Sequence, residues 1–207
     1  MAEQVQVTPS QLSEEKPLSF QDFLKLYDGQ HAELVMGKVY IYMSNSQKHQ
    51  DIFVFLITLL SLKNIGKLVA AGFSMYISDD QPIREPDLMI VLNEHLDRLK
   101  ETYLNGTADV AIEIVSPEST DRDRGVKFAE YEQAGVPEYW IIDPLRSEIL
   151  VYSLGDDQRY HRRELDSHGQ ITSPLLPGFA LEAAILWRKE LPAGKDLIHL
   201  LEQMGAM

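Results

Sequence analysis

One short segment of the chain combines an almost unbroken apolar run with a single central acid. From Ala108 to Val115 the sequence is mostly β-branched or otherwise apolar, and Gly106 and Pro117 bound it. This pattern predicts a strand that is buried on both faces of a sheet. Glu113 lies between two isoleucines, and burying an unpaired carboxylate there is costly. Glu113 therefore needs a cation, a hydrogen-bond donor or a metal, unless it forms an ordinary structural salt bridge or the strand lies at an edge.

The apolar positions elsewhere predict a mixed order of helices and strands. Helical spacing occurs in residues 17–26, 46–63, 121–134 and 193–204, with Gly66 and Gly135 as the residues that end the second and third helices. Residues 32–42 predict a hairpin that turns at Gly37. Further strands are expected at residues 67–77, 84–92, 138–144, 148–153 and 159–165. This order predicts an α/β fold with a central mixed β-sheet flanked by helices.

Length and composition favour one globular domain with additions at its ends. The chain has 207 residues, and we expect a flexible leader at residues 1–16, a main domain at 17–187 and a helical tail at 188–207. Cysteine is absent, which excludes disulfides and a cysteine-ligated zinc site. The leader has no apolar core, and the longest apolar run, residues 52–60, is too short to span a bilayer. We therefore expect a cytoplasmic protein with no membrane partner.

The net charge limits the kinds of partner. With 19 basic and 32 acidic residues the formal charge is −13, which disfavours unspecific, tight binding to nucleic acid. A local basic patch, or a metal that bridges protein carboxylates to a phosphate, is still compatible with this balance. Neither a GxGxxG nor a GxxxxGK[ST] motif is present, so no nucleotide-binding loop of these kinds is expected.

Two carboxylates and a lysine are the candidates for chemistry. Asp87 opens one predicted strand and Glu113 lies in the neighbouring one, and two such carboxylates can hold Mg²⁺ together with water and substrate oxygens. Lys127, from the following helix, can orient or deprotonate water or neutralise charge in a transition state. Asp109 competes with Glu113, but at about 3.3 Å per residue the two lie roughly 13 Å apart. Only one of them can join Asp87, and the more apolar flanks favour Glu113.

Several blocks of the sequence resemble the Uma-two family of restriction endonucleases, within the PD-(D/E)XK nuclease superfamily. The similarity covers about residue 17 to residue 187, and its most specific part is a Glu-Ile-Val-Ser-Pro block followed by Ala-Gly-Val-Pro-Glu-Tyr-Trp. The matching blocks are Glu33–Val39, Arg84–Asp87, Asp109–Ser119, Asp123–Lys127 and Ala134–Pro144. The resemblance implies a restriction-endonuclease-like fold for residues 17–187.

The resemblance also assigns roles to individual residues. Pro86-Asp87 takes the place of the superfamily's PD, and Glu113 that of its (D/E). The usual lysine two positions later is Val115 here, so the basic role passes to Lys127 on the next helix. Glu33 adds a carboxylate from the first hairpin, and His49 could approach the same cleft.

The activity that this resemblance implies is hydrolysis of DNA by a homodimer, with Mg²⁺ or alternatively Mn²⁺ held by Asp87 and Glu113. Two alternatives stay open: a nuclease-like fold that serves as a non-cleaving binding or assembly module, which the acidic composition favours, and a metal-dependent hydrolase of small phosphoesters. Arg84, Arg122 and Arg124 are candidates for phosphate contacts, although a solvated face is expected for two of the three. Tyr139 and Trp140 are expected in the core.

Overall fold

The computed structural model describes most of the chain. The expected leader at residues 1–16 lies outside the described residues, as do several short internal stretches. The described residues are 18–27, 30, 32–35, 37–41, 46–62, 66–70, 72–117 and 119–204.

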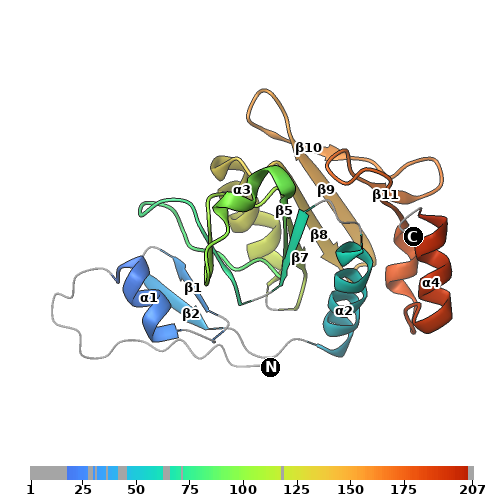
Figure 1. The fold of residues 1–207 in the computed structure, drawn as a ribbon, viewed down its shortest axis with the longest axis horizontal. Helices are drawn as coiled ribbons and strands as arrows, with labels where there is room; N and C mark the ends of the chain where they lie inside the picture. The colour runs from blue at the N-terminus through green and yellow to red at the C-terminus, as the bar shows by residue number, and fades with distance from the viewer. Residues whose placement is uncertain are drawn as a thin grey trace.

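A six-stranded mixed sheet forms the centre of the molecule (Figure 1). Its strands, in spatial order, are β10 (Tyr160–Arg163), β9 (Glu148–Leu154), β8 (Glu138–Asp143), β7 (Val110–Ile114), β5 (Leu88–Leu92) and β3 (Gly66–Ala70). Strands β7 and β8 are parallel, and the other neighbours are antiparallel. This arrangement confirms the α/β fold with a central mixed sheet, and β7 is buried along its whole length, as its apolar run predicts.

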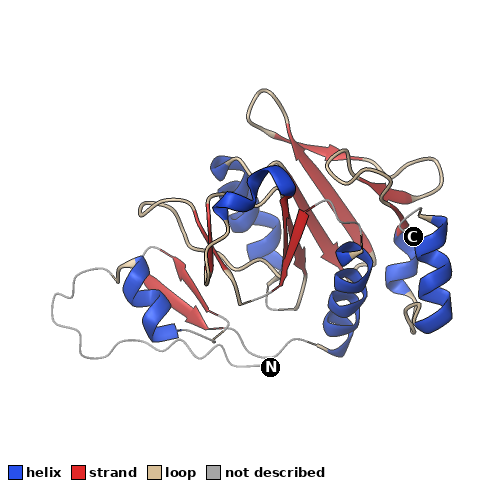
Figure 2. Cartoon of the chain, in the orientation of Figure 1, coloured by secondary structure: helices blue, strands red, loops and turns tan. Residues whose placement is uncertain are grey.

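Helices cover both faces of this sheet (Figure 2). Along β7, Val110, Ile112 and Ile114 belong to the apolar cluster that contains the buried side of α2 (Gln47–Ser61). The alternate residue Ala111 belongs to a second cluster, which includes Tyr131 of α3 (Lys127–Ala134). Since successive side chains of a strand point to opposite faces, Glu113 faces the side of α3.

An N-terminal unit lies beside one end of the sheet. It consists of α1 (Phe20–Tyr27) and the hairpin of β1 (Ala32–Val35) and β2 (Lys38–Ile41), which turns at Gly37 with a positive φ of 76° as predicted. Phe20, Phe23 and Leu34 pack with Ile83 in their own apolar cluster. The Ile83 N–H donates to the Leu34 carbonyl oxygen at 2.9 Å. This bond ties the hairpin, and with it Glu33, to the segment that leads into β5.

The remaining elements of the described chain form two small two-stranded sheets, two short 3-10 helices and a last helix. They are β4 (Ser74–Tyr76), η1 (Asn93–Arg98), β6 (Tyr103–Asn105), β11 (Gln170–Thr172), β12 (Ala180–Glu182), η3 (Ala183–Trp187) and α4 (Gly194–Gln203). Helix α4 is the expected tail helix. Its Leu201, and Met204 just after the end of the helix, belong to the same apolar cluster as the buried residues of α2. None of the helices in the described part of the chain has the length and apolar character needed to cross a membrane.

Several boundaries differ from the sequence prediction: the strand expected at residues 84–92 begins at Leu88, and the helix expected at 121–134 is a π-helical turn followed by α3. Two further differences have a clear physical cause. Gly66 does not end α2, which finishes at Ser61; it begins β3, where an added Cβ would collide with the Val91 carbonyl oxygen. The single strand expected at residues 67–77 is two strands, β3 and β4, in different sheets. In both cases close packing against neighbouring strands decides the structure, and this packing is not visible in a local pattern.

Buried Glu138 opens β8 and faces the side of the sheet that α2 covers. Its Oε1 accepts a hydrogen bond from Trp140 Nε1 at 2.5 Å, and its Oε2 accepts one from Ser173 Oγ at 3.1 Å. Burial raises the pKa of Glu138, although these two hydrogen bonds lower it in part. The folded protein therefore holds this proton more tightly than the unfolded chain.

We predict that Glu138→Gln changes how stability depends on pH. A raised folded-state pKa means that this group costs stability as the pH rises from the ordinary glutamate value through the raised value. The free energy of unfolding of the variant, relative to that of the native protein, should therefore increase over that pH range. Urea denaturation between pH 4 and pH 8 measures it, with exposed Glu101→Gln as the control. A difference that does not change with pH would contradict this account of Glu138.

Candidate functional site

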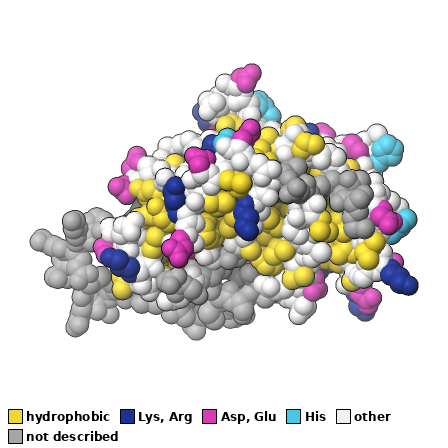
Figure 3. All heavy atoms as spheres, in the orientation of Figure 1, with side chains coloured by type: hydrophobic (Ala, Val, Ile, Leu, Met, Phe, Trp, Pro, Cys, Tyr) yellow, Lys and Arg dark blue, Asp and Glu magenta, His cyan; other side chains and the backbone are white. Residues whose placement is uncertain are grey.

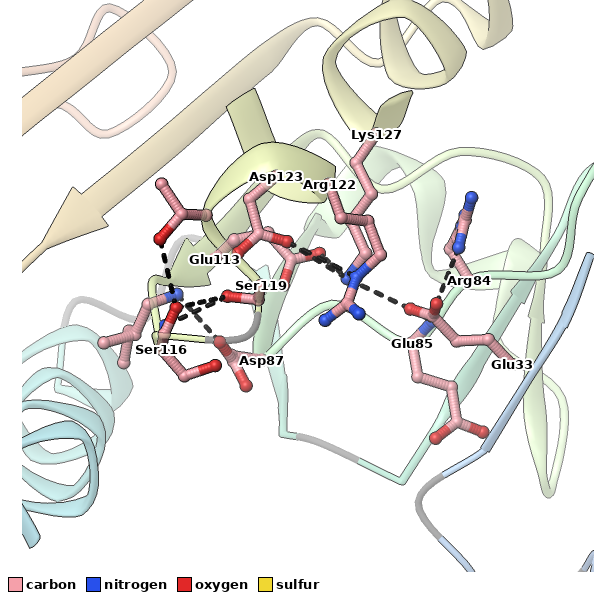
Figure 4. A network of polar contacts seen from close by, with 12 residues as sticks. Glu33, Arg84, Glu85, Asp87, Glu113, Ser116, Ser119, Arg122, Asp123 and Lys127 are labelled. Atoms are coloured by element: carbon pink, nitrogen blue, oxygen red, sulfur yellow. Dashed lines mark hydrogen bonds and ion pairs between the residues drawn. The ribbon is translucent and has the colours of Figure 1, made fainter. Parts of the chain in front are cut away.

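The structure places the four residues expected in the site on four different elements. Glu33 comes from β1, Asp87 immediately precedes β5, Glu113 lies near the end of β7, and Lys127 begins α3. All four are buried, with at most 6% of their surface exposed. Figure 4 shows the carboxylates of Glu33 and Glu113 directed toward the Lys127 ammonium group from opposite sides.

Lys127 connects two of these acids directly. Its Nζ donates to Glu113 Oε1 at 2.7 Å and lies 3.0 Å from Glu33 Oε1. The Tyr131 hydroxyl donates to the same Glu113 oxygen at 2.8 Å. Lys127 and Tyr131 lie one helical turn apart on α3, so one face of this helix supplies both donors. The partner that the buried position of Glu113 requires is therefore a lysine assisted by a tyrosine.

Sequence reasoning did not assign Asp123, which lies at the same site. It belongs to a π-helical turn, η2 (Arg122–Val126), that leads into α3, and such turns are frequent at functional sites. Its Oδ1 is 3.8 Å from Lys127 Nζ and is buried without a hydrogen bond. The four-residue spacing from Asp123 to Lys127 to Tyr131 is a signal that could have found it.

A second set of contacts holds Glu33 in place. Arg84 Nη1 donates to Glu33 Oε2 at 2.6 Å, while its Nε and Nη2 donate to the two carboxylate oxygens of Glu130 at 2.7 and 2.9 Å. Arg84 is only 3% exposed. Arg84 therefore links the hairpin to α3 in the interior of the protein. It is not on the solvated surface, and its guanidinium group is not open for contact with a phosphate.

Asp87 lies beside this cluster and is held by other groups. Leu88 pairs with Ile112, so Asp87 is one position beyond this pair, on the side of Glu113. Its Oδ2 accepts a hydrogen bond from the Ile114 N–H at 2.7 Å and lies 3.2 Å from His49 Nε2. His49, left open by the sequence, is buried in the first turn of α2 and contacts Asp87 directly.

Asp109, the rival of Glu113, lies at the opposite end of the strand. Its Oδ2 accepts from the Leu92 N–H at 2.8 Å, and its Oδ1 lies 2.7 Å from His95 Nδ1. Asp109 thus contacts the end of β5 through one carboxylate oxygen and η1 through the other. Asp87 is close to the Glu113 end of β7, so the structure brings Asp87 and Glu113 together and leaves Asp109 apart.

The charges of this cluster act strongly on one another. Burial raises the pKa of Glu113, and Asp123, Asp87 and Glu33 raise it further, whereas Lys127 lowers it. Burial alone would lower the pKa of Lys127, but the surrounding carboxylates outweigh it and the net shift is upward. Lys127 therefore stays an ammonium ion near neutral pH and acts as a donor and a positive charge, not as a base.

Comparison with solved structures defines the class of the fold. A protein from Anabaena variabilis ATCC 29413, described as "a putative nuclease belonging to DUF820", is similar to this chain with a TM-score of 0.66 and 18% sequence identity. The match covers 83% of this chain and 98% of that one. The fold is therefore nuclease-like.

The sequence itself identifies the family. The model of the Uma2 family, whose description is "Putative restriction endonuclease", matches residues 20–184. The chain belongs to this family, which confirms the resemblance seen in its motifs. A comparison with curated protein sequences gives no significant match.

We predict that Lys127→Met strongly destabilises the protein. The substitution keeps a long, flexible side chain but leaves the carboxylates of Glu113 and Glu33 buried without the ammonium group that both contact. Removing one partner of a buried ion pair typically costs about 3–5 kcal/mol. The free energy of unfolding, measured in urea, should fall by this amount.

Tyr131→Phe is the matched control on the same helix face, because it removes only one hydrogen bond to Glu113. It should cost about 1 kcal/mol. If Lys127→Met cost no more than Tyr131→Phe, the lysine would not be the group that stabilises the buried acids.

Proposed function

We propose that this protein is a metal-dependent endonuclease that hydrolyses phosphodiester bonds in DNA. The main support is the buried Lys127, which binds Glu113 and Glu33 beside Asp87 in a chain of the Uma2 family. In this proposal Asp87 and Glu113 hold Mg²⁺, with Mn²⁺ as a substitute, and Lys127 assists the attack of water.

The chemistry of the donors fits a hard divalent cation. Carboxylate oxygens are the ligands that Mg²⁺ prefers, and one or two protein carboxylates with several waters are sufficient. Glu33, Asp87, Glu113 and Asp123 bring four buried acids to the surroundings of Lys127, and Asp123 Oδ1 has no hydrogen bond. Among the described residues there is no ready group of three or more histidine or acidic side chains for a metal. The proposal therefore needs only Asp87 and Glu113 as protein ligands, with water and substrate oxygens completing the coordination.

The roles of the side chains follow from their contacts. A bound Mg²⁺ would supply Lewis-acid stabilisation of the phosphate and lower the pKa of a bound water. Lys127, as an ammonium ion, orients water by hydrogen bonding and stabilises negative charge that develops on the phosphate. Glu33 holds Lys127 in this position and is itself fixed by Arg84. The Ile114 N–H and His49 orient the carboxylate of Asp87.

Arg122 is our candidate for contact with the phosphate of the substrate. Figure 4 shows its guanidinium group next to the Lys127 ammonium group, and 26% of its side chain is exposed. Arg84 is bound to two carboxylates in the interior, and Arg124 Nη2 donates to Asp143 and Glu148, both at 2.7 Å. Arg122 Nε lies 3.9 Å from Asp123 Oδ1, so of the three arginines proposed from the sequence Arg122 is the one whose ion pair lies at the proposed site.

We predict that Asp87→Asn and Glu113→Gln abolish metal-dependent cleavage and leave the fold intact. The amide oxygen of an asparagine in place of Asp87 can still accept the bond from the Ile114 N–H, and a glutamine keeps the size of the Glu113 side chain. Cleavage of plasmid and linear DNA is measured with Mg²⁺ or Mn²⁺, and binding of Mg²⁺ by calorimetry. Glu101→Gln, an exposed acid outside the proposed site, is the control.

The expected result is cleavage and Mg²⁺ binding by the native protein and the control, and neither by the two site variants. Native protein that binds Mg²⁺ but cuts neither DNA nor RNA would refute the nuclease proposal while keeping the metal site. Variants that cut as well as the native protein would refute the assignment of Asp87 and Glu113.

We predict that Arg122→Gln weakens the binding of DNA and that Arg124→Gln does not. Loss of one phosphate contact reduces the dependence of log affinity on log salt concentration by about 1, which fluorescence anisotropy at several salt concentrations measures. Arg124→Gln should instead lower the melting temperature, because Asp143 and Glu148 lose their shared partner. Equal DNA affinity and salt dependence in native protein and Arg122→Gln would remove Arg122 from the site.

A non-cleaving binding or assembly module is the second candidate. The net charge of −13 favours it, and on the described surface seen in Figure 3 the Lys and Arg side chains are interspersed with acidic and hydrophobic ones. Such a module would show no Mg²⁺ binding that depends on Asp87. A homodimer and a small phosphoester as substrate stay predictions that sizing in solution and substrate screening test.

A further inference from the structure

A cavity that contains none of the residues proposed for hydrolysis lies beside helix α1. It is a cavity of about 350 Å³ between α1 and the segments that carry Ser74 and Glu85. Pockets of 300–1,000 Å³ are the usual size for small molecules and cofactors. Lys127, Glu113, Asp87 and Asp123 do not line it, so this cavity is separate from the site proposed for hydrolysis.

Glu85 gives this cavity an acceptor that the protein does not use. Only 5% of the residue is exposed, its Oε1 accepts from Ser74 Oγ at 3.0 Å, and its Oε2 is buried without a hydrogen bond. Figure 4 shows its carboxylate pointing away from Lys127 and from the carboxylate of Glu33. Buried acceptors without a donor are rare in folded proteins. A ligand with an N–H group would supply the missing donor.

The other lining residues restrict the ligand further. Phe23, Leu24 and Tyr27 of α1 provide an apolar wall, on which the rings of Phe23 and Tyr27 stack with centroids 5.5 Å apart. Lys25 and Glu85 are the only charged residues among those that line the cavity in the described structure. Lys25 offers a positive charge to an anionic group, and Glu85 offers a carboxylate oxygen to a hydrogen-bond donor. The cavity suits a ligand with an N–H donor, an apolar planar body and an anionic group.

We propose that this cavity binds a single nucleotide, with an amino-bearing base toward Glu85 and a phosphate toward Lys25. The same chemistry comes from two sources: a free nucleoside monophosphate, or an unstacked nucleotide of a nucleic acid strand. Proteins that accept an extruded base read it by hydrogen bonds to its edge and by contact with aromatic side chains. The first source does not depend on the proposed nuclease activity, whereas the second rests on it.

The cavity is also connected to the Lys127 cluster. The backbone N–H of Glu85 donates to Glu33 Oε1 at 3.5 Å, and the same oxygen contacts Lys127. Glu33 would therefore connect a nucleotide-binding residue, Glu85, to Lys127, which we propose acts in hydrolysis.

Calorimetry on the full chain, without divalent ions, tests the proposal with the 5′-monophosphates of guanosine, cytidine, adenosine and thymidine. We expect saturable binding, with Glu85→Gln weakening the three amino-bearing nucleotides at least tenfold. Lys25→Gln should weaken the monophosphates but not the corresponding nucleosides. Lys38→Gln, an exposed lysine outside the cavity, is the matched control and should change neither.

Three other results of the calorimetry would contradict the proposal that the cavity binds a nucleotide. No binding of any monophosphate at millimolar concentration, or binding that neither Glu85→Gln nor Lys25→Gln weakens, overturns the proposal. Binding of spermidine in place of nucleotides also overturns it. Since Lys25 is exposed, its variant gives an answer even if Glu85→Gln fails to fold.

The source of the nucleotide is tested with a single-stranded oligonucleotide that carries 2-aminopurine, in the Glu113→Gln background and without divalent ions. A rise in fluorescence that Glu85→Gln removes supports an extruded base. Binding of free monophosphates without this rise supports a site for free nucleotides. Nucleotide binding by a protein that never cleaves DNA would refute the nuclease function and leave this inference intact.

Discussion

Lys127 brings a positive charge into the interior of the protein, and the arrangement of the acids around it depends on this charge. Glu113, Glu33 and Asp123 lie at 2.7, 3.0 and 3.8 Å from its ammonium nitrogen. Without it, β7 could not keep a carboxylate in an otherwise apolar strand. The lysine does not balance this charge alone, because Asp87 also lies close enough to raise the pKa of Glu113. The excess of buried acids over basic groups beside Lys127 is the property that the proposed divalent cation would use.

The rest of the fold positions this cluster. The antiparallel pairing of β5 with β7 brings Asp87 to the end of the strand that carries Glu113. A π-helical turn adds Asp123 just before α3, and Arg84 links the hairpin to α3 through Glu33 and Glu130. These supports fix the side chains in a water-poor interior, where electrostatic interactions are stronger than in water. The side chains of the cluster are therefore held by ion pairs between elements that are distant in sequence.

Much of this arrangement could be predicted from the sequence, for identifiable reasons. The apolar run around Glu113 indicates a buried strand with an unusual acid, and the family motifs indicate Asp87 and Lys127. The partners of Arg84 could not be predicted, because Glu33 and Glu130 are 51 and 46 residues away. Asp123 was not assigned because the sequence does not predict the π-helical turn that directs it to the site; the four-residue spacing to Lys127 is the one pattern that indicates it. Gly66 was misassigned because its role depends on the close approach of β5.

The central claim is that the acids around Lys127 form a binding site for a divalent cation. Anomalous scattering from crystals of the full chain grown with Mn²⁺ tests it most directly. We predict a single strong Mn²⁺ peak within about 2.5 Å of carboxylate oxygens of both Asp87 and Glu113, a distance typical of oxygen ligands. Saturating Mn²⁺ with no peak at these two residues, and the Lys127–Glu113 contact unchanged, would contradict it.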